Sequence, residues 1–311
     1  MRAYFLHPSD LRLELKETSA PQPAAGQLLV RVRAAGLNRG EFLRHGLTKP
    51  GAAKIGGTEG AGELPSGEKV MGRLPGSFAE YALMDAADAI PVPPHLSWEE
   101  AAAIPITFLV VYDMLVQQGN LQADEWLLVT GVSAGVGVAA LLAAKALGAK
   151  VIGTSGSEEK LNRLKAMGLD VPIRTRSPDF SRQVLEATGG KGVDLAVNNV
   201  GGSMFAECIR CLGFEGGLAT VGYVDGVMRS EIDIEALHSK RLRLFGVSNK
   251  NRNGAQRGVT VQGFTRDFLP LFASGKLKPV LDRVYDFKDL PEAKARMEAN
   301  AHLGKLVVRN Y

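Results

Sequence analysis

Hydrophobic and polar residues alternate along roughly the first hundred positions, in short segments that glycine and proline separate. The alternating segments are residues 2–6, 11–15, 27–34, 67–71 and 77–84. Alternation with a period of two is typical of strands that bury one face. This part of the chain is therefore predicted to form an antiparallel, barrel-like β domain.

The pattern changes after a proline-rich stretch that ends at Pro94. Ser97 followed by Glu100 predicts a capped helix start, and a helical segment over 101–118 leads into the next region. There, apolar runs alternate with helical patterns, and the expected strands are 126–130, 150–154, 193–198, 217–222 and 242–247. Strands that alternate with helices predict an α/β fold with a doubly wound parallel sheet.

The C-terminal segment returns to a short mixed pattern. It predicts a helix over 264–274, a strand over 283–287, a helix over 291–300 and a final strand over 305–309. We expect this tail to complete the first domain. The expected organisation is one domain formed by residues 1–112 and 252–311, with residues 113–251 forming the other.

A glycine-containing turn joins the first predicted parallel strand to its helix, which is expected to start near Val138. The residues at the turn are Ala134, Gly135, Val136 and Gly137. A turn of this kind lets a pyrophosphate approach the backbone and the N-terminus of the helix. Two of the three glycine positions of the G-x-G-x-x-G pattern hold other residues. A βαβ unit that binds nothing is the alternative, but the strand–turn–helix context favours dinucleotide binding.

The end of the second parallel strand indicates which dinucleotide binds. NAD-binding units carry an acidic residue there, whereas this chain has small residues up to Ser157 and no acid before Glu158. Ser155 or Ser157 could donate hydrogen bonds to a 2′-phosphate, and the basic side chains Lys160, Arg174 and Arg176 could supply positive charge. NADPH is therefore favoured over NADH. Ordinary solvated surface is the alternative for the three basic side chains.

Three later strand ends are expected at the carboxyl edge of the sheet, where ligands bind. The candidate cofactor contacts there are Asn199, Val200, Gly222, Tyr223 and Ser248. Tight turns between strand and helix would account for any single glycine at this edge.

Composition excludes several classes. The 311 residues include 37 basic and 33 acidic side chains without a basic stripe, so no nucleic-acid partner is expected. No signal peptide is apparent, and the apolar run 101–111 is too short to span a bilayer, so we expect a cytoplasmic protein without a membrane partner. Cys208 and Cys211 lack a second ligand pair and are interpreted as free thiols on a helix.

Taken together, the motifs resemble the medium-chain dehydrogenase/reductase superfamily, and within it the zinc-independent quinone oxidoreductase (zeta-crystallin-like) branch. The resemblance implies a GroES-like β domain, completed by both chain ends, beside a Rossmann domain. It is carried, in the family's order, by residues 32–38, 57–62, 77–81, the Gly135 loop, 194–202, 275–279 and 300–305.

The resemblance also implies a site without metal. Zinc-dependent relatives have Cys where Asn38 stands, His where Thr58 stands and often Cys where Ile106 stands. Asn38 is then the candidate catalytic residue, expected to donate a hydrogen bond to the nicotinamide or the acceptor. Its alternative role is a buried amide that fixes the loop. Three features depart from the branch, namely Thr48, Val110 and a shortened region 63–77.

These features predict an NADPH-dependent enzyme that transfers hydride to a small acceptor, a quinone or an α,β-unsaturated carbonyl. Two alternatives remain open. One is an NADPH-binding sensor or interaction protein with little turnover, and the other is an enoyl-thioester reductase with Arg39, Arg44 and Lys54 as phosphate contacts. A homodimer formed through the apolar run Leu242–Val247 is also expected.

Overall fold

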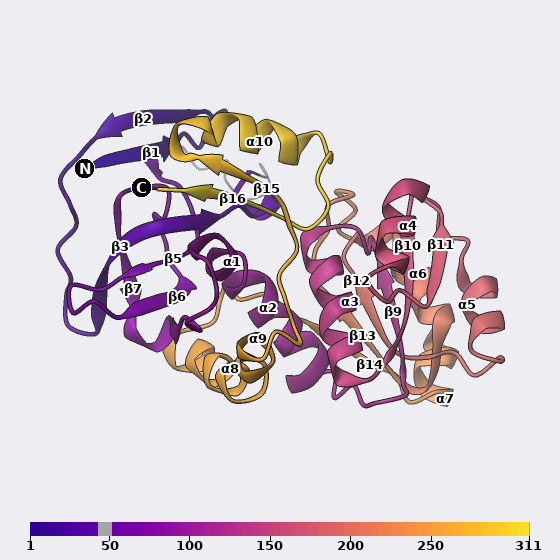
Figure 1. Cartoon of the computed structure of the whole chain (residues 1–311). Coiled ribbons are helices and arrows are strands. Elements are labelled where there is room, and N and C mark those ends of the chain that lie inside the picture. Colours follow the sequence, from indigo (N-terminus) through magenta and orange to yellow (C-terminus); the bar gives the residue numbers. More distant parts are fainter. Residues whose placement is uncertain (43–51, 311) are drawn as a thin grey trace. The chain divides into compact units, whose positions relative to one another are not determined.

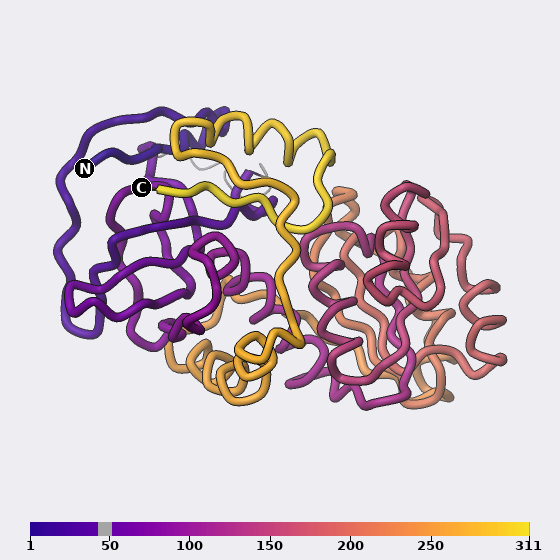
Figure 2. Tube along the Cα trace, in the orientation of Figure 1, coloured from indigo at the N-terminus to yellow at the C-terminus, as the bar shows by residue number. Residues whose placement is uncertain are grey.

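The computed structural model describes residues 1–42 and 52–310. The chain divides into two compact units, which are residues 1–109 together with 252–311, and residues 110–251 (Figure 1). Both chain ends belong to the first unit (Figure 2). Within the described residues, no helix has the length and apolar character that crossing a membrane requires.

The first unit is built on a seven-stranded sheet in the order β15-β16-β3-β5-β6-β8, with β7 also paired to β3. A smaller sheet has the order β2-β1-β4. All of these pairs are antiparallel except β15–β16, and β16 pairs with β3. The C-terminal strand therefore completes this β domain, as predicted. The strands are β1 (Arg2–Leu6), β2 (Leu13–Glu17), β3 (Gln27–Gly36), β4 (Lys54–Ile55), β5 (Glu59–Glu63), β6 (Lys69–Arg73), β7 (Tyr81–Asp85), β8 (Ala89–Pro91), β15 (Leu281–Asp286) and β16 (Lys305–Arg309).

Strand β5 shows why part of this sheet was missed. Its sequence, EGAGE, lacks the β-branched and aromatic residues that mark strands. The small residues are required by packing, because a Cβ atom on Gly62 would lie 2.1 Å from the carbonyl oxygen of Arg31. The shortened region 63–77 retains a tight β5–β6 hairpin, closed by a hydrogen bond from the Leu64 N–H to the Glu68 carbonyl.

The predicted long helix over 101–118 is wrong. The structure has α1 (Trp98–Ala102), a break, α2 (Pro105–Tyr112) and then a π-helical turn, η3 (Asp113–Gln117). Pro105 lacks an N–H and occupies the first position of α2, so the helix restarts there. The capping box is confirmed, because Ser97 Oγ accepts from the Glu100 N–H and Glu100 Oε2 accepts from the Ser97 N–H.

The remaining helices of the first unit cover its sheets or link its strands. The predicted helix over 264–274 is two helices, since α8 ends before residue 268 and α9 follows. These helices are η1 (Arg39–Phe42), η2 (Ala86–Asp88), α8 (Gly254–Asp267), α9 (Leu269–Ala273), η4 (Phe287–Asp289) and α10 (Leu290–Glu298).

The second unit contains a six-stranded parallel sheet in the order β11-β10-β9-β12-β13-β14, with helices on both faces. In sequence order these strands read 3-2-1-4-5-6, the arrangement of a Rossmann fold, so the predicted sheet is confirmed. The five expected strands are present, and the short strand β11, which contains Pro172, was missed. The strands are β9 (Trp126–Thr130), β10 (Lys150–Ser155), β11 (Val171–Arg174), β12 (Val193–Asn198), β13 (Leu212–Thr220) and β14 (Arg243–Gly246).

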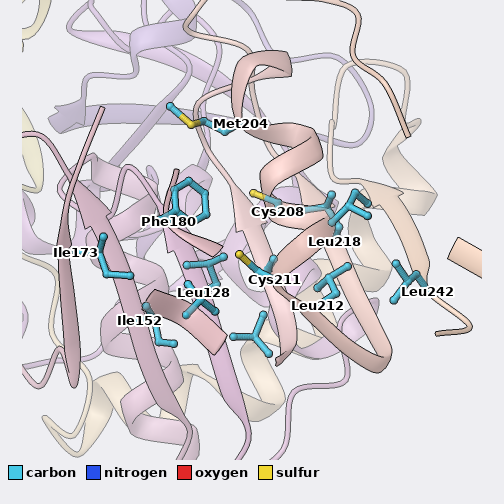
Figure 3. Packing of buried hydrophobic residues seen from close by; sticks show 14 residues of the cluster. Leu128, Ile152, Ile173, Phe180, Met204, Cys208, Cys211, Leu212, Leu218 and Leu242 are labelled. Atoms are coloured by element: carbon cyan, nitrogen blue, oxygen red, sulfur yellow. The ribbon is translucent and has the colours of Figure 1, made fainter. Parts of the chain in front are cut away.

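Helices of the second unit bury an apolar cluster against this sheet (Figure 3). Cys208 and Cys211 lie inside the cluster as free, buried thiols, as expected. Burial raises the pKa of Cys211 to about 12, which favours the neutral thiol. The helices are α3 (Gly135–Leu147), α4 (Glu158–Lys165), α5 (Ser181–Ala187), α6 (Gly202–Cys211) and α7 (Ile234–Ser239).

Candidate functional site

The loop between β9 and α3 presents an open helix N-terminus. Helix α3 begins at Gly135, earlier than the predicted start near Val138, and its N-cap Ala134 has no side chain to accept from the first-turn N–H groups. A Cβ atom on Gly137 would lie 2.6 Å from the Gly131 carbonyl oxygen, so only glycine lets the helix pack this closely on the loop. Ala134 is exposed, whereas Gly135 and Val136 are half-buried. The four predicted loop residues therefore lie together where a helix can bind a phosphate.

The carboxyl ends of β9 and β12 are joined by a buried polar network. The Thr130 hydroxyl donates to Asn198 Oδ1 at 3.2 Å and accepts from the Asn199 N–H at 3.1 Å. Asn198 Oδ1 also accepts from the Val200 N–H at 3.0 Å. Asn199 donates through Nδ2 to the Thr130 carbonyl, and its buried Oδ1 has no hydrogen-bond partner within the described part of the chain. At this switch point of the sheet, Asn199 therefore keeps an acceptor that a ligand hydroxyl or amide could satisfy.

The other predicted edge residues follow the neighbouring strands. Val200 faces the α3 loop, since a Cβ atom on Gly131 would lie 3.5 Å from its Cγ2. A Cβ atom on Gly222 would meet no other atom nearer than 3.9 Å, which leaves open space after β13. Tyr223 is 45% exposed, and Ser248, after β14, is exposed as well. These residues border one edge of the sheet, as expected for a ligand-binding face.

The end of β10 gathers the residues predicted to select the cofactor. A Cβ atom on Gly156 would lie 2.2 Å from Arg176 Nε, so the Arg176 side chain lies directly against this turn. Ser155 is buried, with its hydroxyl 3.1 Å from that of Ser133, and Lys160 lies in the first turn of α4. The turn combines hydroxyl and guanidinium donors, which fits a phosphate better than a ribose hydroxyl pair.

Asn38 lies in the first unit, at the centre of a second polar cluster. Its Nδ2 donates to Glu59 Oε1 at 2.9 Å, to Glu41 Oε1 at 3.2 Å and to Thr58 Oγ1 at 3.3 Å. Its Oδ1 accepts from Lys305 Nζ at 2.9 Å. The amide is thus engaged on both sides, which is the pattern of a residue that fixes a loop. Donation from Asn38 to a nicotinamide or an acceptor stays a prediction.

Glu59 links three elements of this cluster. Its side chain is fully buried and pairs with Lys305, which comes from β16. Its Oε2 accepts from the Ile106 N–H at 2.7 Å, in the first turn of α2. A carboxylate at that position stabilises the N-terminus of the helix. The sequence motif contained Glu59, but nothing near it in sequence indicated Lys305 as its partner.

Glu41 is the residue that sequence reasoning missed. Its Oε1 accepts from the Thr58 hydroxyl at 2.7 Å, and its buried Oε2 has no hydrogen-bond partner among the residues described. Burial raises the pKa of Glu41 to about 7, and the hydrogen bonds from Thr58 and Asn38 only partly offset this effect. Its spacing of three residues from Asn38 places both at the single turn of η1, a signal that could have been used.

At the positions where zinc-dependent enzymes of the resembled family have their zinc ligands, this chain has side chains that do not form a zinc-binding set. Asn38 and Thr58 provide an amide and a hydroxyl, whereas catalytic zinc is held by three thiolate, imidazole or carboxylate ligands. No group of three or more His, Cys, Asp and Glu side chains arranged for a metal occurs within residues 1–42 and 52–310. Val110 lies half-buried in α2. Thr48 and Arg44 lie outside the described residues.

Arg39 forms hydrogen bonds at the C-terminal end of α10. Its Nη2 donates to the Met297 carbonyl and to Asn300 Oδ1, each at 2.6 Å. Burial lowers its pKa, with the Glu298 carboxylate acting in the opposite direction. The side chain therefore contacts the C-terminal end of α10, which occupies one of its guanidinium nitrogens.

The chain is similar in sequence to a dehydrogenase family and to parts of polyketide synthases. The zinc-binding dehydrogenase family matches residues 135–260, beginning at the first residue of α3. The curated relatives include a phenolphthiocerol/phthiocerol polyketide synthase protein of Mycobacterium tuberculosis, 28% identical over 95% of this chain. A spectinabilin polyketide synthase protein of Streptomyces orinoci is 32% identical over 94% of it. The chain spans only 14% and 13% of those two proteins.

Solved structures match over the full length. A quinone oxidoreductase of Thermus thermophilus, described alone and in complex with NADPH, is 28% identical with a TM-score of 0.87, and all of both chains is covered. An NAD-dependent alcohol dehydrogenase is also 28% identical, with a TM-score of 0.85 and full coverage of both chains. The two-domain architecture of the chain is therefore shared with dehydrogenases and reductases of this type.

Proposed function

We propose that this chain, whose fold and domain match support a place in the medium-chain dehydrogenase/reductase family, reduces a quinone or an α,β-unsaturated carbonyl with NADPH. The observation that carries the proposal is the donor set around Asn38. An amide and a hydroxyl stand where a zinc-dependent enzyme needs metal ligands, so an alkoxide would have no Lewis acid to stabilise it. An acceptor that is already electrophilic does not need one.

The cofactor of the proposed reaction is NADP(H). Bound there, it supplies the hydride. The open N-terminus of α3 would hold its pyrophosphate, and Asn199 Oδ1 would accept from a hydroxyl or amide of the ligand. Ser155, Lys160 and Arg176 would hold the 2′-phosphate. These residues would bind the cofactor and orient it.

A second candidate is the reduction of an enoyl thioester, which the similarity to polyketide synthases favours. Its chemistry is also hydride transfer to a conjugated carbonyl compound. The commitment of Arg39 to α10 weighs against a carrier-phosphate site at that side chain. A small thioester that lacks the carrier is therefore the appropriate probe.

The test is loss of NADPH absorbance with a panel of quinones, enones and a crotonyl thioester, repeated with NADH and with a chelator. Turnover of quinones or enones that prefers NADPH and resists the chelator is the expected result. Preferential turnover of the thioester would select the second candidate. NADPH binding without turnover of any acceptor would contradict both and favour a cofactor-binding sensor.

The proposed contact between Arg176 and the 2′-phosphate can be tested by a substitution. Arg176→Met is expected to raise the Kd for NADPH about 10-fold and to leave the Kd for NADH unchanged, because one charge-assisted contact is lost. Arg182→Met is the matched control, since the Arg182 side chain is 84% exposed and pairs only loosely with Glu186. An equal loss of affinity for both cofactors would place Arg176 elsewhere in the site.

A further inference from the structure

The cluster around Glu41 brings two carboxyl groups and one ammonium group out of water. Among residues 1–42 and 52–310, the charged groups that face Glu41 are Glu59 and Lys305, and Glu59 is fully buried against the Lys305 ammonium. That pair is neutral as a unit. An ionised Glu41 beside it would add an uncompensated buried charge, which is expensive in a protein interior.

The hydrogen bonds of Glu41 reach only one of its two carboxyl oxygens. Its donors among the described residues all reach Oε1, namely the Thr58 hydroxyl at 2.7 Å and the side-chain and backbone N–H groups of Asn38 at 3.2 Å. Oε2 is buried and receives no donor within the described residues. A carboxylate places charge on both oxygens, so an oxygen without a donor is tolerated far better in a carboxylic acid.

Thr58 connects this acid to the place where an acceptor is proposed to bind. Its side chain is half-buried, and its oxygen lies within hydrogen-bond distance of Glu41 and of Asn38 Nδ2. A hydroxyl both donates and accepts, so the 2.7 Å contact can run in either direction. When Glu41 is the donor, the Thr58 proton is free for another acceptor.

We propose that Glu41 and Thr58 form a proton relay for the reductase reaction, an inference that rests on the proposed function. Hydride addition to an enone carbon moves the C=C electron pair into an enolate, which then needs one proton. Thr58 gives its hydroxyl proton to the enolate and takes one from Glu41 across the 2.7 Å contact. Glu41 is left as a carboxylate and regains a proton from water. The sum is acceptor plus hydride plus one proton.

The experiment compares wild type with Glu41→Gln, Thr58→Val and the conservative Thr58→Ser in kcat, KM, NADPH affinity and pH profile. Wild-type kcat is expected to fall as pH rises through about 7, because an ionised Glu41 has no proton to give. Glu41→Gln and Thr58→Val are expected to lower kcat about 100-fold, to abolish that pH dependence and to leave NADPH affinity unchanged. Thr58→Ser is expected to retain the wild-type profile.

Glu63→Gln is the matched control, since Glu63 lies at the far end of β5, the strand that follows Thr58, and pairs with Arg33 outside the cluster. It is expected to behave as wild type. Activity and a pH profile unchanged in Glu41→Gln and Thr58→Val would overturn the relay while leaving the proposed reductase intact. Loss of NADPH binding in both variants would show a structural role and also overturn it. A wild type without turnover on any acceptor would refute the proposed function and the relay together.

Discussion

At the scale of the residue, the sequence identified Asn38 as a site residue but did not indicate which side chains surround it. Asn38 stood out because zinc-dependent relatives have Cys at that position. Its Oδ1 accepts from Lys305, which is 267 positions away, and its Nδ2 donates to Glu59. A family pattern can indicate which residue occupies a site. The protonation state of Glu41 depends on burial and on charges brought together by folding, so it was not predictable.

The raised pKa of Glu41 has a consequence for stability. Its folded value of about 7 lies above its ordinary value of 4.5, so the folded protein binds the proton more tightly than the unfolded chain. Stability is therefore expected to fall as pH rises from about 4.5 through about 7, by about 1 to 3 kcal/mol in total. Urea unfolding across this range would measure the change.

Glu41→Gln supplies the comparison for that prediction, because an amide does not titrate. We expect the variant to match wild type near pH 5 and to exceed it in free energy of unfolding near pH 8.5 by a similar amount, about 1 to 3 kcal/mol. Parallel pH dependences in the two proteins would assign the loss of stability to other groups.

At the scale of the element, prediction succeeded where periodicity was strong and failed where packing selected small residues. The boundaries of β1, β9, β12 and β16 were predicted as observed. β5 was missed because close approach of β3 excludes the side chains that mark a strand. The break before α2 was not predicted, although Pro105 marked it. Such failures arise where a neighbouring element, rather than local preference, determines the residue.

The close packing of α3 against its loop predicts that a side chain at Gly137 is destabilising. Gly137→Ala would place a Cβ atom 2.6 Å from the Gly131 carbonyl oxygen and 2.7 Å from Val132 Cα, both backbone atoms that move together with the loop. We expect a loss of about 1 to 3 kcal/mol in the free energy of unfolding and at least a roughly 10-fold weaker NADPH affinity. Denaturant titration and fluorescence binding would measure the two effects.

Gly258→Ala is the control for this substitution. Gly258 is also a helical glycine, but its added Cβ would meet only the Ala87 side chain, at 3.8 Å. There, alanine is expected to be neutral or to stabilise by up to about 1 kcal/mol, because it favours helix. Equal effects of the two substitutions would mean that the α3 loop tolerates a side chain and that its glycine is not required for binding.

At the scale of the whole molecule, the sheet of the second unit ends in two unlike edge strands. β11 carries Pro172, which has no N–H to offer to another strand. β14 pairs with β13 on one side and has no such protection in its sequence, RLFG. Unprotected edges tend to be covered. The proposed homodimer would cover this one, along a strand close to the predicted run Leu242–Val247.

The backbone of β14 indicates how to test the homodimer. The Val247 N–H donates to the Thr220 carbonyl at 3.4 Å, so the alternate residue Gly246 directs its N–H away from β13. Gly246→Pro would remove that donor without removing a bond to β13. In sedimentation velocity at micromolar concentration we expect a dimer for wild type and a monomer for the variant, with the near-ultraviolet circular dichroism unchanged. A wild type that sediments as a monomer would refute the dimer. A Gly246→Pro protein that remains dimeric would place the interface on another surface. In that case the short length of β14 would be what protects its edge against pairing with another strand.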